Sequence, residues 1–177
     1  MTGLRLPSKM LVLLPLFLTG VTAATPPLFS APPLALKPWE ILSLNTFSPS
    51  YRPGTLQYSV INMTITDPNE YPPAWAVRCA TKWEFEALPY GQVHNCSEAG
   101  DAHWSFEMIK TDSAYSSPTQ DFILRFVATR HADTFEGSAR FAVGDNIRGL
   151  CSASGVCAFQ LKEELIPFQI IQEKRSL

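Results

Sequence analysis

The chain has 177 residues, of which 14 are Lys or Arg and 16 are Asp or Glu, giving a formal net charge of −2 at pH 7. Nucleic-acid binding needs a basic patch that matches a phosphate backbone. Because the charge balance of this chain is mildly acidic, it lacks such a patch, and we expect no nucleic-acid partner. The length suits one domain with a sizeable hydrophobic core.

Residues 1–23 have the three parts of a secretory signal peptide. Residues 1–9 include two basic residues and no acidic one, residues 10–18 are apolar, and small residues end the segment at Ala23 and Ala24. A charged start, an apolar run of roughly 7–15 residues and an A-x-A-like end are typical of such peptides. Crossing a bilayer takes roughly 20 apolar residues, so this run is too short for a membrane anchor. We therefore expect a secreted, extracellular protein, cleaved after Ala23 or, as second choice, after Ala24.

Residues 24–38 form a proline-rich lead-in with five prolines. Proline fixes its own φ and favours extended backbone at the residue before it, so this stretch should be extended. Its removal as a short propeptide is an alternative. We expect one domain over 39–177.

From residue 39 onward, apolar and polar residues alternate with the period of two that is typical of β-strands. In 56–66, for example, Ile61 faces one side and Asn62 the other. The alternating segments are 56–66, 82–86, 103–108, 122–127 and 135–143, with shorter strands expected at 75–79, 158–162 and 167–171. Segment 122–127 is apolar on both faces, which favours a central strand. No long segment keeps a helical period with caps. The sequence therefore predicts an all-β fold, a small antiparallel β-barrel or sandwich.

The four cysteines are Cys79, Cys96, Cys151 and Cys157. An even number in a secreted chain indicates two disulfides, for which three connectivities are possible. We favour the sequential pairs, Cys79–Cys96 and Cys151–Cys157, because each encloses turn residues. Such turns let two Cα atoms approach to the roughly 5.5–6 Å that is typical of a disulfide. Zinc binding is the alternative, but zinc cysteines come as close C-x₂₋₄-C pairs, and neither spacing fits.

These residues, taken in order, resemble a known family. The matching stretches are Trp39-Glu40-Ile41, Tyr58-Ser59-Val60-Ile61, Asp67-Pro68-Asn69, Cys79 with Trp83, Cys96 with Trp104-Ser105-Phe106, and 151–157. The set is similar to the fungal allergen-and-elicitor family whose founding member is the major allergen of Alternaria. The similarity spans 39–171, and the proline-rich lead-in is not part of its pattern.

The resemblance implies a small secreted fungal β-barrel whose disulfides are paired in sequence order. It also implies a role at the host interface, as an allergen, an elicitor of plant defence or a virulence effector. It implies no established enzyme activity, and the only positions that carry over are the four cysteines.

No recognisable catalytic motif occurs in the sequence, neither the G-x-S-x-G elbow nor H-E-x-x-H. The histidines His94, His103 and His131 lie in polar surroundings, where we expect solvated side chains. Glu84 and Glu86 share one strand face, but they alternate with aromatic residues that belong inside, so both carboxylates should face water. We expect no catalytic, cofactor-binding or metal-binding residue. A secreted hydrolase with an unrecognised site is the alternative, because a catalytic triad is defined by geometry and not by sequence order.

Aromatic residues are the other candidates for a binding site. The tryptophans Trp39, Trp75, Trp83 and Trp104 are able to line a groove for a carbohydrate or a phenolic ligand. The alternation instead puts Trp83 and Trp104 in the core and leaves Trp75 the most exposed. Tyrosines expected in loops, where exposed tyrosines often serve recognition, are Tyr71, Tyr90 and Tyr115.

Two N-x-S/T glycosylation sequons occur, at Asn62 and Asn95. Asn62 lies on the polar phase of its strand, so a glycan fits there. Asn95 precedes a disulfide cysteine, whose early oxidation would compete with glycan transfer. We therefore expect Asn62 to be the better acceptor.

These features predict a secreted, non-enzymatic glycoprotein that acts through its surface, and the resemblance implies that it is fungal. The expected partner is a host (plant) extracellular protein or a small apolar or phenolic ligand, with no membrane and no cofactor involved. A structural, cell-wall-associated protein is a further alternative.

Overall fold

The computed structural model describes residues 35–70, 76–84, 87–98 and 100–175 of the chain. All of them belong to one compact unit that begins at Leu34. The expected signal peptide, most of the proline-rich lead-in, and Tyr71, Trp75 and Glu86 lie outside the described residues. Among the residues that are described, no helix is long and apolar enough to cross a membrane.

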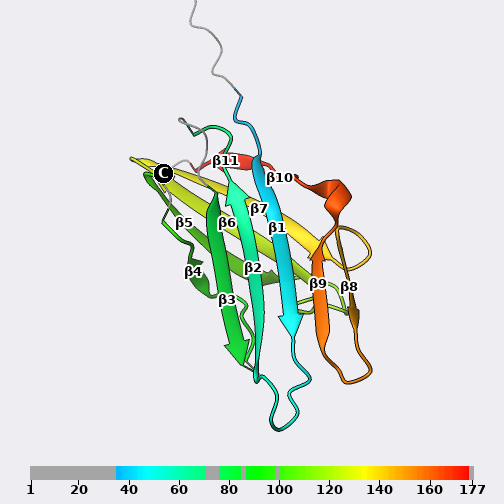
Figure 1. The fold of residues 1–177 in the computed structure, drawn as a ribbon. Helices are drawn as coiled ribbons and strands as arrows, with labels where there is room; N and C mark the ends of the chain where they lie inside the picture. The colour runs from blue at the N-terminus through cyan, green and yellow to red at the C-terminus, as the bar shows by residue number, and fades with distance from the viewer. Residues whose placement is uncertain (1–34, 71–75, 85–86, 99, 176–177) are drawn as a thin grey trace, which may run out of the picture. The chain divides into compact units, whose positions relative to one another are not determined.

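The described residues fold into β-strands and one short 3₁₀-helix (Figure 1). The strands are β1 (Trp39–Ser48), β2 (Tyr58–Thr66), β3 (Val77–Glu84), β4 (Val93–Asn95), β5 (Ala102–Lys110), β6 (Asp121–Arg130), β7 (Asp133–Ala142), β8 (Ile147–Cys151), β9 (Cys157–Leu161), β10 (Phe168–Ile170) and β11 (Gln172–Lys174). The 3₁₀-helix η1 spans Glu163–Leu165, between β9 and β10.

These strands form two antiparallel sheets. Sheet A has the order β3-β2-β1-β9-β8, with β10 paired to the first residues of β1. Sheet B has the order β11-β7-β6-β5-β4. Figure 1 shows the strands of one sheet crossing those of the other at an angle. The sequence did not distinguish a β-barrel from a β-sandwich, and the structure shows a sandwich-like fold.

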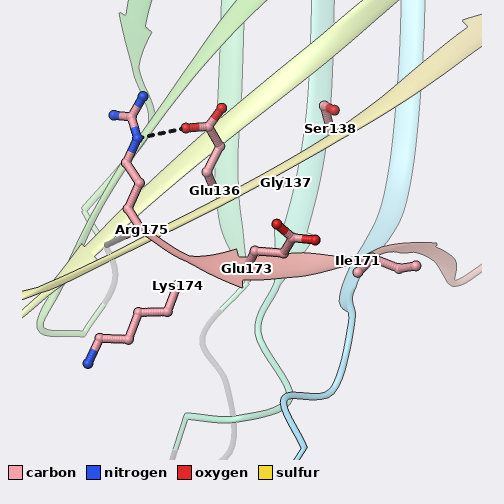
Figure 2. Close-up of a pocket in the computed structure, with 7 residues that line it drawn as sticks. All are labelled: Glu136, Gly137, Ser138, Ile171, Glu173, Lys174 and Arg175. Carbon is pink, nitrogen blue, oxygen red and sulfur yellow. Dashed lines mark ion pairs between the residues drawn. The ribbon is translucent and has the colours of Figure 1, made fainter. Parts of the chain in front are cut away.

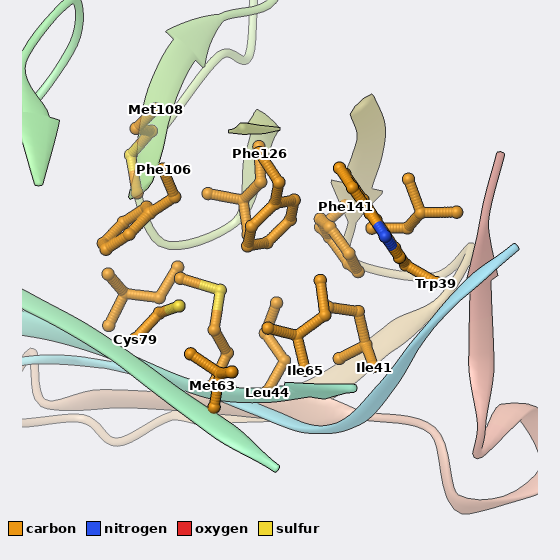
Figure 3. Close-up of a cluster of buried hydrophobic side chains, with 14 of the residues drawn as sticks. Trp39, Ile41, Leu44, Met63, Ile65, Cys79, Phe106, Met108, Phe126 and Phe141 are labelled. Atoms are coloured by element: carbon orange, nitrogen blue, oxygen red, sulfur yellow. The ribbon is translucent and has the colours of Figure 1, made fainter. Parts of the chain in front are cut away.

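The core lies between the sheets and follows the predicted alternation. In β2, Ile61, Met63 and Ile65 are buried, whereas Asn62 is exposed. Strand β6 lies at the centre of sheet B, as predicted for a segment that is apolar on both faces. Figure 3 shows the apolar side chains of both sheets meeting, with Trp39, Ile41, Leu44, Met63, Ile65, Cys79, Phe106, Met108, Phe126 and Phe141 labelled. Burying one such large side chain completely stabilises the fold by about 1.5–3 kcal/mol.

Both predicted disulfides are confirmed. Cys79 of β3 is bonded to Cys96, which directly follows β4, so this disulfide joins an edge of sheet A to an edge of sheet B. Cys151 and Cys157 are bonded across the β8–β9 hairpin, within sheet A.

A buried polar cluster joins the two sheets where β1 begins. Asp67, directly after β2, is 1% exposed, and its Oδ2 accepts a hydrogen bond from Trp39 Nε1 at 2.9 Å. The guanidinium of Arg130, at the end of β6, lies 3.0 Å from the same oxygen. Gln172 of β11 donates from Nε2 to the carbonyl oxygen of Lys37 at 2.8 Å. The bonds to Asp67 thus join Trp39 of sheet A to Arg130 of sheet B and supply the partners that a buried carboxylate needs.

Candidate functional site

An apolar row of side chains crosses the outer face of sheet A. Val60 of β2 is paired with Phe47 of β1, Phe47 with Ala158 of β9, and Ala158 with Leu150 of β8. Paired residues on one face of a sheet are neighbours, so these four side chains lie side by side. Val60 and Phe47 are half-buried, and Leu150 is 82% exposed. One exposed apolar side chain is ordinary, but Leu150 continues a row with Ala158, Phe47 and Val60, and contiguous apolar patches mark the surfaces at which ligands and partners bind.

A polar row runs directly beside it. Asn62 of β2 is paired with Asn45 of β1, Asn45 with Gln160 of β9, and Gln160 with Arg148 of β8. Asn62 Nδ2 donates a hydrogen bond to Asn45 Oδ1 at 3.3 Å. Arg148 forms an exposed ion pair with Glu163 at 2.8 Å. The row therefore offers three side-chain amides, each with donors and an acceptor, along the edge of the apolar row.

The two rows border a hollow of about 560 Å³ on strands β1, β9 and β8. Its lining residues are Asn45, Thr46, Phe47, Arg148, Gly149, Leu150, Ala158, Phe159 and Gln160. A volume of this size lies within the range of sites that take small molecules, roughly 300–1,000 Å³. Ala158 forms a low floor between the larger side chains of Phe47 and Leu150, which suits a flat apolar ligand.

Gly149 allows the wall of this hollow to form. A Cβ atom built on Gly149 would lie 1.9 Å from the carbonyl oxygen of Ala158, closer than any side chain tolerates. Glycine is therefore needed where β8 approaches β9. The disulfide between Cys151 and Cys157 holds the same hairpin. The disulfide thus closes the end of the hairpin whose five residue pairs form the wall.

A second hollow, of about 420 Å³, lies along β7 and β11 of sheet B. Figure 2 shows its lining residues, with the ion pair between Arg175 Nε and Glu136 Oε2 at 3.0 Å. Glu173 lies directly opposite Glu136 in the strand register, and Lys174 pairs with Asp133 at 2.8 Å. Partly exposed pairs of this kind contribute little to binding or stability, and they leave a solvated, charged surface. The hollow on sheet A is the better candidate for an apolar ligand.

The three histidines differ in how far their side chains are exposed. His103 and His131 are exposed, as predicted. The prediction for His94 was wrong, because His94 is half-buried, with its ring 5.4 Å from that of Phe106 and Nδ1 3.2 Å from Thr81 Oγ1. Its polar neighbours in the sequence concealed strand β4, whose pairing with β5 turns His94 inward.

No metal site emerges in the described part of the chain, where no group of three or more His, Cys, Asp and Glu side chains is able to hold an ion.

The aromatic residues are largely structural. Trp39, Trp83 and Trp104 are buried in the core, as the alternation predicted for the last two. Tyr115 is 87% exposed, as expected for a loop. Tyr90 is half-buried against the core, so the expectation of an exposed tyrosine was wrong there. The bridge between Tyr90 and Met108 explains this, because it holds the loop against β5.

Four of the described groups have shifted pKa values, and none of them lies in the hollow on sheet A. Arg140 donates hydrogen bonds to both carboxylate oxygens of Asp121, at 2.8 and 2.9 Å, and these bonds lower the pKa of Asp121 and raise that of Arg140. Burial raises the pKa of Tyr90. Burial, together with the nearby charge of Asp67, raises the pKa of Glu70. Because structural ion pairs also shift pKa values, these groups do not by themselves indicate catalysis.

Both sequons lie on exposed positions of strands. Asn62 points outward from the middle of β2, as its polar phase predicted. Asn95 ends β4 and precedes the disulfide-bonded Cys96. Neither position is blocked by burial.

No protein-family model, no curated protein and no solved structure matches the chain. The resemblance to the fungal allergen-and-elicitor family therefore stays a prediction from the residues quoted for it.

Sequence reasoning did not find Phe47, Ala158, Leu150 or Gly149 as site residues. Each is an ordinary apolar or small residue in its own segment. They form a site only through the cross-strand register, which a single sequence does not reveal.

Proposed function

We propose that this chain is a secreted, non-enzymatic binding protein whose ligand is a small, flat apolar or phenolic molecule. The observation that carries the proposal is the apolar row from Val60 to Leu150, set in register beside a row of amides. Secretion is supported by the pattern of residues 1–23 and by two disulfides, which persist in oxidising compartments.

The chemistry of the hollow matches an aromatic ring with hydroxyl groups at its edge. The ring would lie on Ala158, between Phe47 and Leu150, and remove apolar surface of both larger side chains from water. Its hydroxyl groups would then reach the amides of Asn45 and Gln160, which both donate and accept hydrogen bonds. Because the hollow is open to solvent, affinity would come chiefly from the apolar contact.

A host extracellular protein is the second candidate partner. It is favoured by exposed apolar side chains outside the hollow, of which Ile171 is 75% and Tyr115 87% exposed. Under either candidate, the family resemblance points to action at a plant surface as an allergen, elicitor or effector. A hydrolytic activity and a purely structural cell-wall role remain the alternatives that the experiment must separate.

Titration of the purified protein with ferulic acid, a plant phenolic, tests the proposal by calorimetry and by amide chemical shifts. Leu150→Asp should weaken binding about tenfold or more, because an acid at the wall of the hollow disfavours an apolar ring. Leu88→Asp is the matched control, since Leu88 is 60% exposed in the loop before β4 and does not line the hollow. Equal affinities for the two variants would refute the site. Chemical conversion of the ligand would refute the non-enzymatic function.

A further inference from the structure

Asn62, on β2, is the first residue of the polar row that borders the hollow. Its side chain is exposed on the outer face of sheet A, and its Nδ2 already points along the row, at 3.3 Å from Asn45 Oδ1. In the sequon Asn62-Met63-Thr64, Nδ2 is the atom that would carry an N-linked glycan. Glycan transfer replaces one of the two hydrogens of Nδ2, and the other is able to keep the bond to Asn45 Oδ1, so the first sugar is held beside β1 at the polar row.

The hollow lies within reach of the first sugars. Neighbouring strands are about 4.8 Å apart, so Asn45 is one strand spacing and Gln160 two spacings from Asn62. Sugar hydroxyl and acetamido groups form hydrogen bonds with side-chain amides, which both positions supply. The less polar face of a pyranose ring packs well on an aromatic side chain, and Phe47 lies beside this path.

We propose that an N-linked glycan on Asn62 lies across the polar row and closes the hollow, so that glycosylation of Asn62 controls access of the ligand. The transfer forms a bond from Asn62 Nδ2 to C1 of the first N-acetylglucosamine and releases the amide proton. It breaks the bond from C1 to the diphosphate of the lipid-linked oligosaccharide donor. Control of access rests on the proposed function, because it requires that the hollow binds a ligand.

The second sequon serves as an internal comparison. Asn95 lies in β4, at the edge of sheet B, and its cross-strand neighbour is Ser105. Neither residue lines the hollow on sheet A. A glycan on Asn95 should therefore extend into solvent and leave ligand binding unchanged.

The test uses the full chain secreted from a eukaryotic host, with the occupancy of each sequon measured by mass spectrometry. Asn62→Gln and Thr64→Ala each remove the acceptor, whereas Thr64→Ser keeps it. The wild type and Thr64→Ser carry the glycan, whereas Asn62→Gln and Thr64→Ala do not. If the glycan covers the hollow about nine tenths of the time, the two glycosylated proteins should bind ferulic acid about tenfold more weakly than the two variants without it. Asn95→Gln should bind like the wild type.

A second measurement does not depend on any ligand. Peptide-N-glycosidase should release the Asn62 glycan from the folded protein about tenfold more slowly than from the denatured chain, because the sugars that lie on the sheet are shielded for most of the time. Amide and aromatic resonances of Phe47 should also shift when the glycan is removed.

The results separate the inference from the proposed function. An unoccupied Asn62 in the secreted protein, release as fast as from the denatured chain, or equal ferulic acid binding in all glycoforms would overturn the inference. If variants without the Asn62 glycan bind no ferulic acid, the proposed function fails. The release rate and the Phe47 shifts then still decide whether the glycan lies on this face.

Discussion

Replacing Arg130 with methionine would remove the guanidinium that faces Asp67 while keeping an unbranched apolar stem. The ion pair is 3.0 Å long, and the two side chains are 16% and 0% exposed. Removing one partner of a buried pair costs about 3–5 kcal/mol, and the residual exposure of Arg130 places this case at the lower end. The guanidinium also lies 4.4 Å from the ring centre of Phe135, a contact worth about 0.5–1 kcal/mol. We expect a loss of about 3–4 kcal/mol in the free energy of unfolding.

At about 2–4 °C per kcal/mol for a domain of this size, the melting temperature should fall by roughly 10 °C. Scanning calorimetry and guanidinium unfolding measure both quantities. Arg148→Met is the matched control, because Arg148 and Glu163 form an ion pair of 2.8 Å whose side chains are 49% and 76% exposed. An exposed pair contributes about 0–1 kcal/mol, so this variant should melt close to the wild type.

A double-mutant cycle refines the test. Asp67→Asn alone leaves the guanidinium of Arg130 without a charged partner, and the double variant removes both charges. The double variant should therefore lose about 1–3 kcal/mol less than the sum of the single variants. If Arg130→Met melts like Arg148→Met, or if the two losses simply add, the cluster does not join the sheets in the way described.

Three further outcomes follow from the geometry. Cys79→Ser should lower the free energy of unfolding by about 2–5 kcal/mol, since it releases β3 from the end of β4, and an unchanged urea midpoint would contradict this. Gly149→Ala should separate β8 from β9, because its Cβ would lie 1.9 Å from the Ala158 carbonyl oxygen. Faster amide exchange in the paired residues of 147–151 and 157–161, and weaker ferulic acid binding, are expected. Hydrogen bonds from Arg140 lower the pKa of Asp121 below 3.8, so the stabilisation is complete above pH 3.8 and disappears as the pH falls through the lowered value. Arg140→Gln should thus melt below the wild type at neutral pH, with the difference shrinking in strong acid; a constant difference would refute the assignment.

The alternation of residues predicted most of the sheet strands and their inward faces. It succeeded for 56–66 and 122–127, where β2 and β6 were found, because one buried face imposes a strict period of two. The cysteine pairing was also predictable, since each pair encloses turns. These features depend on residues near one another in the sequence.

Strand β1 was not predicted, although it lies at the centre of sheet A. Its register with β2 shifts between Ile41 and Ser43, so Trp39 and Ile41 face the core in one phase and Leu44 and Thr46 in the other. One extra residue of this kind breaks the period of two. Strands β4, β8 and β11 were missed for another reason, because three to five residues hold too few alternations to stand out.

The polar cluster and the hollow were beyond prediction because they depend on distant residues. Asp67-Pro68-Asn69 forms a turn, in which the Glu70 N–H donates to the Asp67 carbonyl oxygen at 3.2 Å. The partners of the Asp67 side chain come from β1 and β6, far along the chain. Asn62 was predicted to face solvent, but its neighbours Asn45 and Gln160 follow only from the strand register.

The position of the hollow has a physical consequence for binding. Its wall is the β8–β9 hairpin, which the Cys151–Cys157 disulfide closes and in which Gly149 permits close contact with Ala158. Its opposite side is β1, a central strand whose inward residues are fixed in the core. A ligand or sugar that binds there orders the exposed side chains of the two rows but not the paired strands that present them, which limits the entropic cost of binding. A glycan on Asn62 would likewise meet strands that are already paired, so the cost of ordering falls on the sugars and on the exposed side chains that they contact.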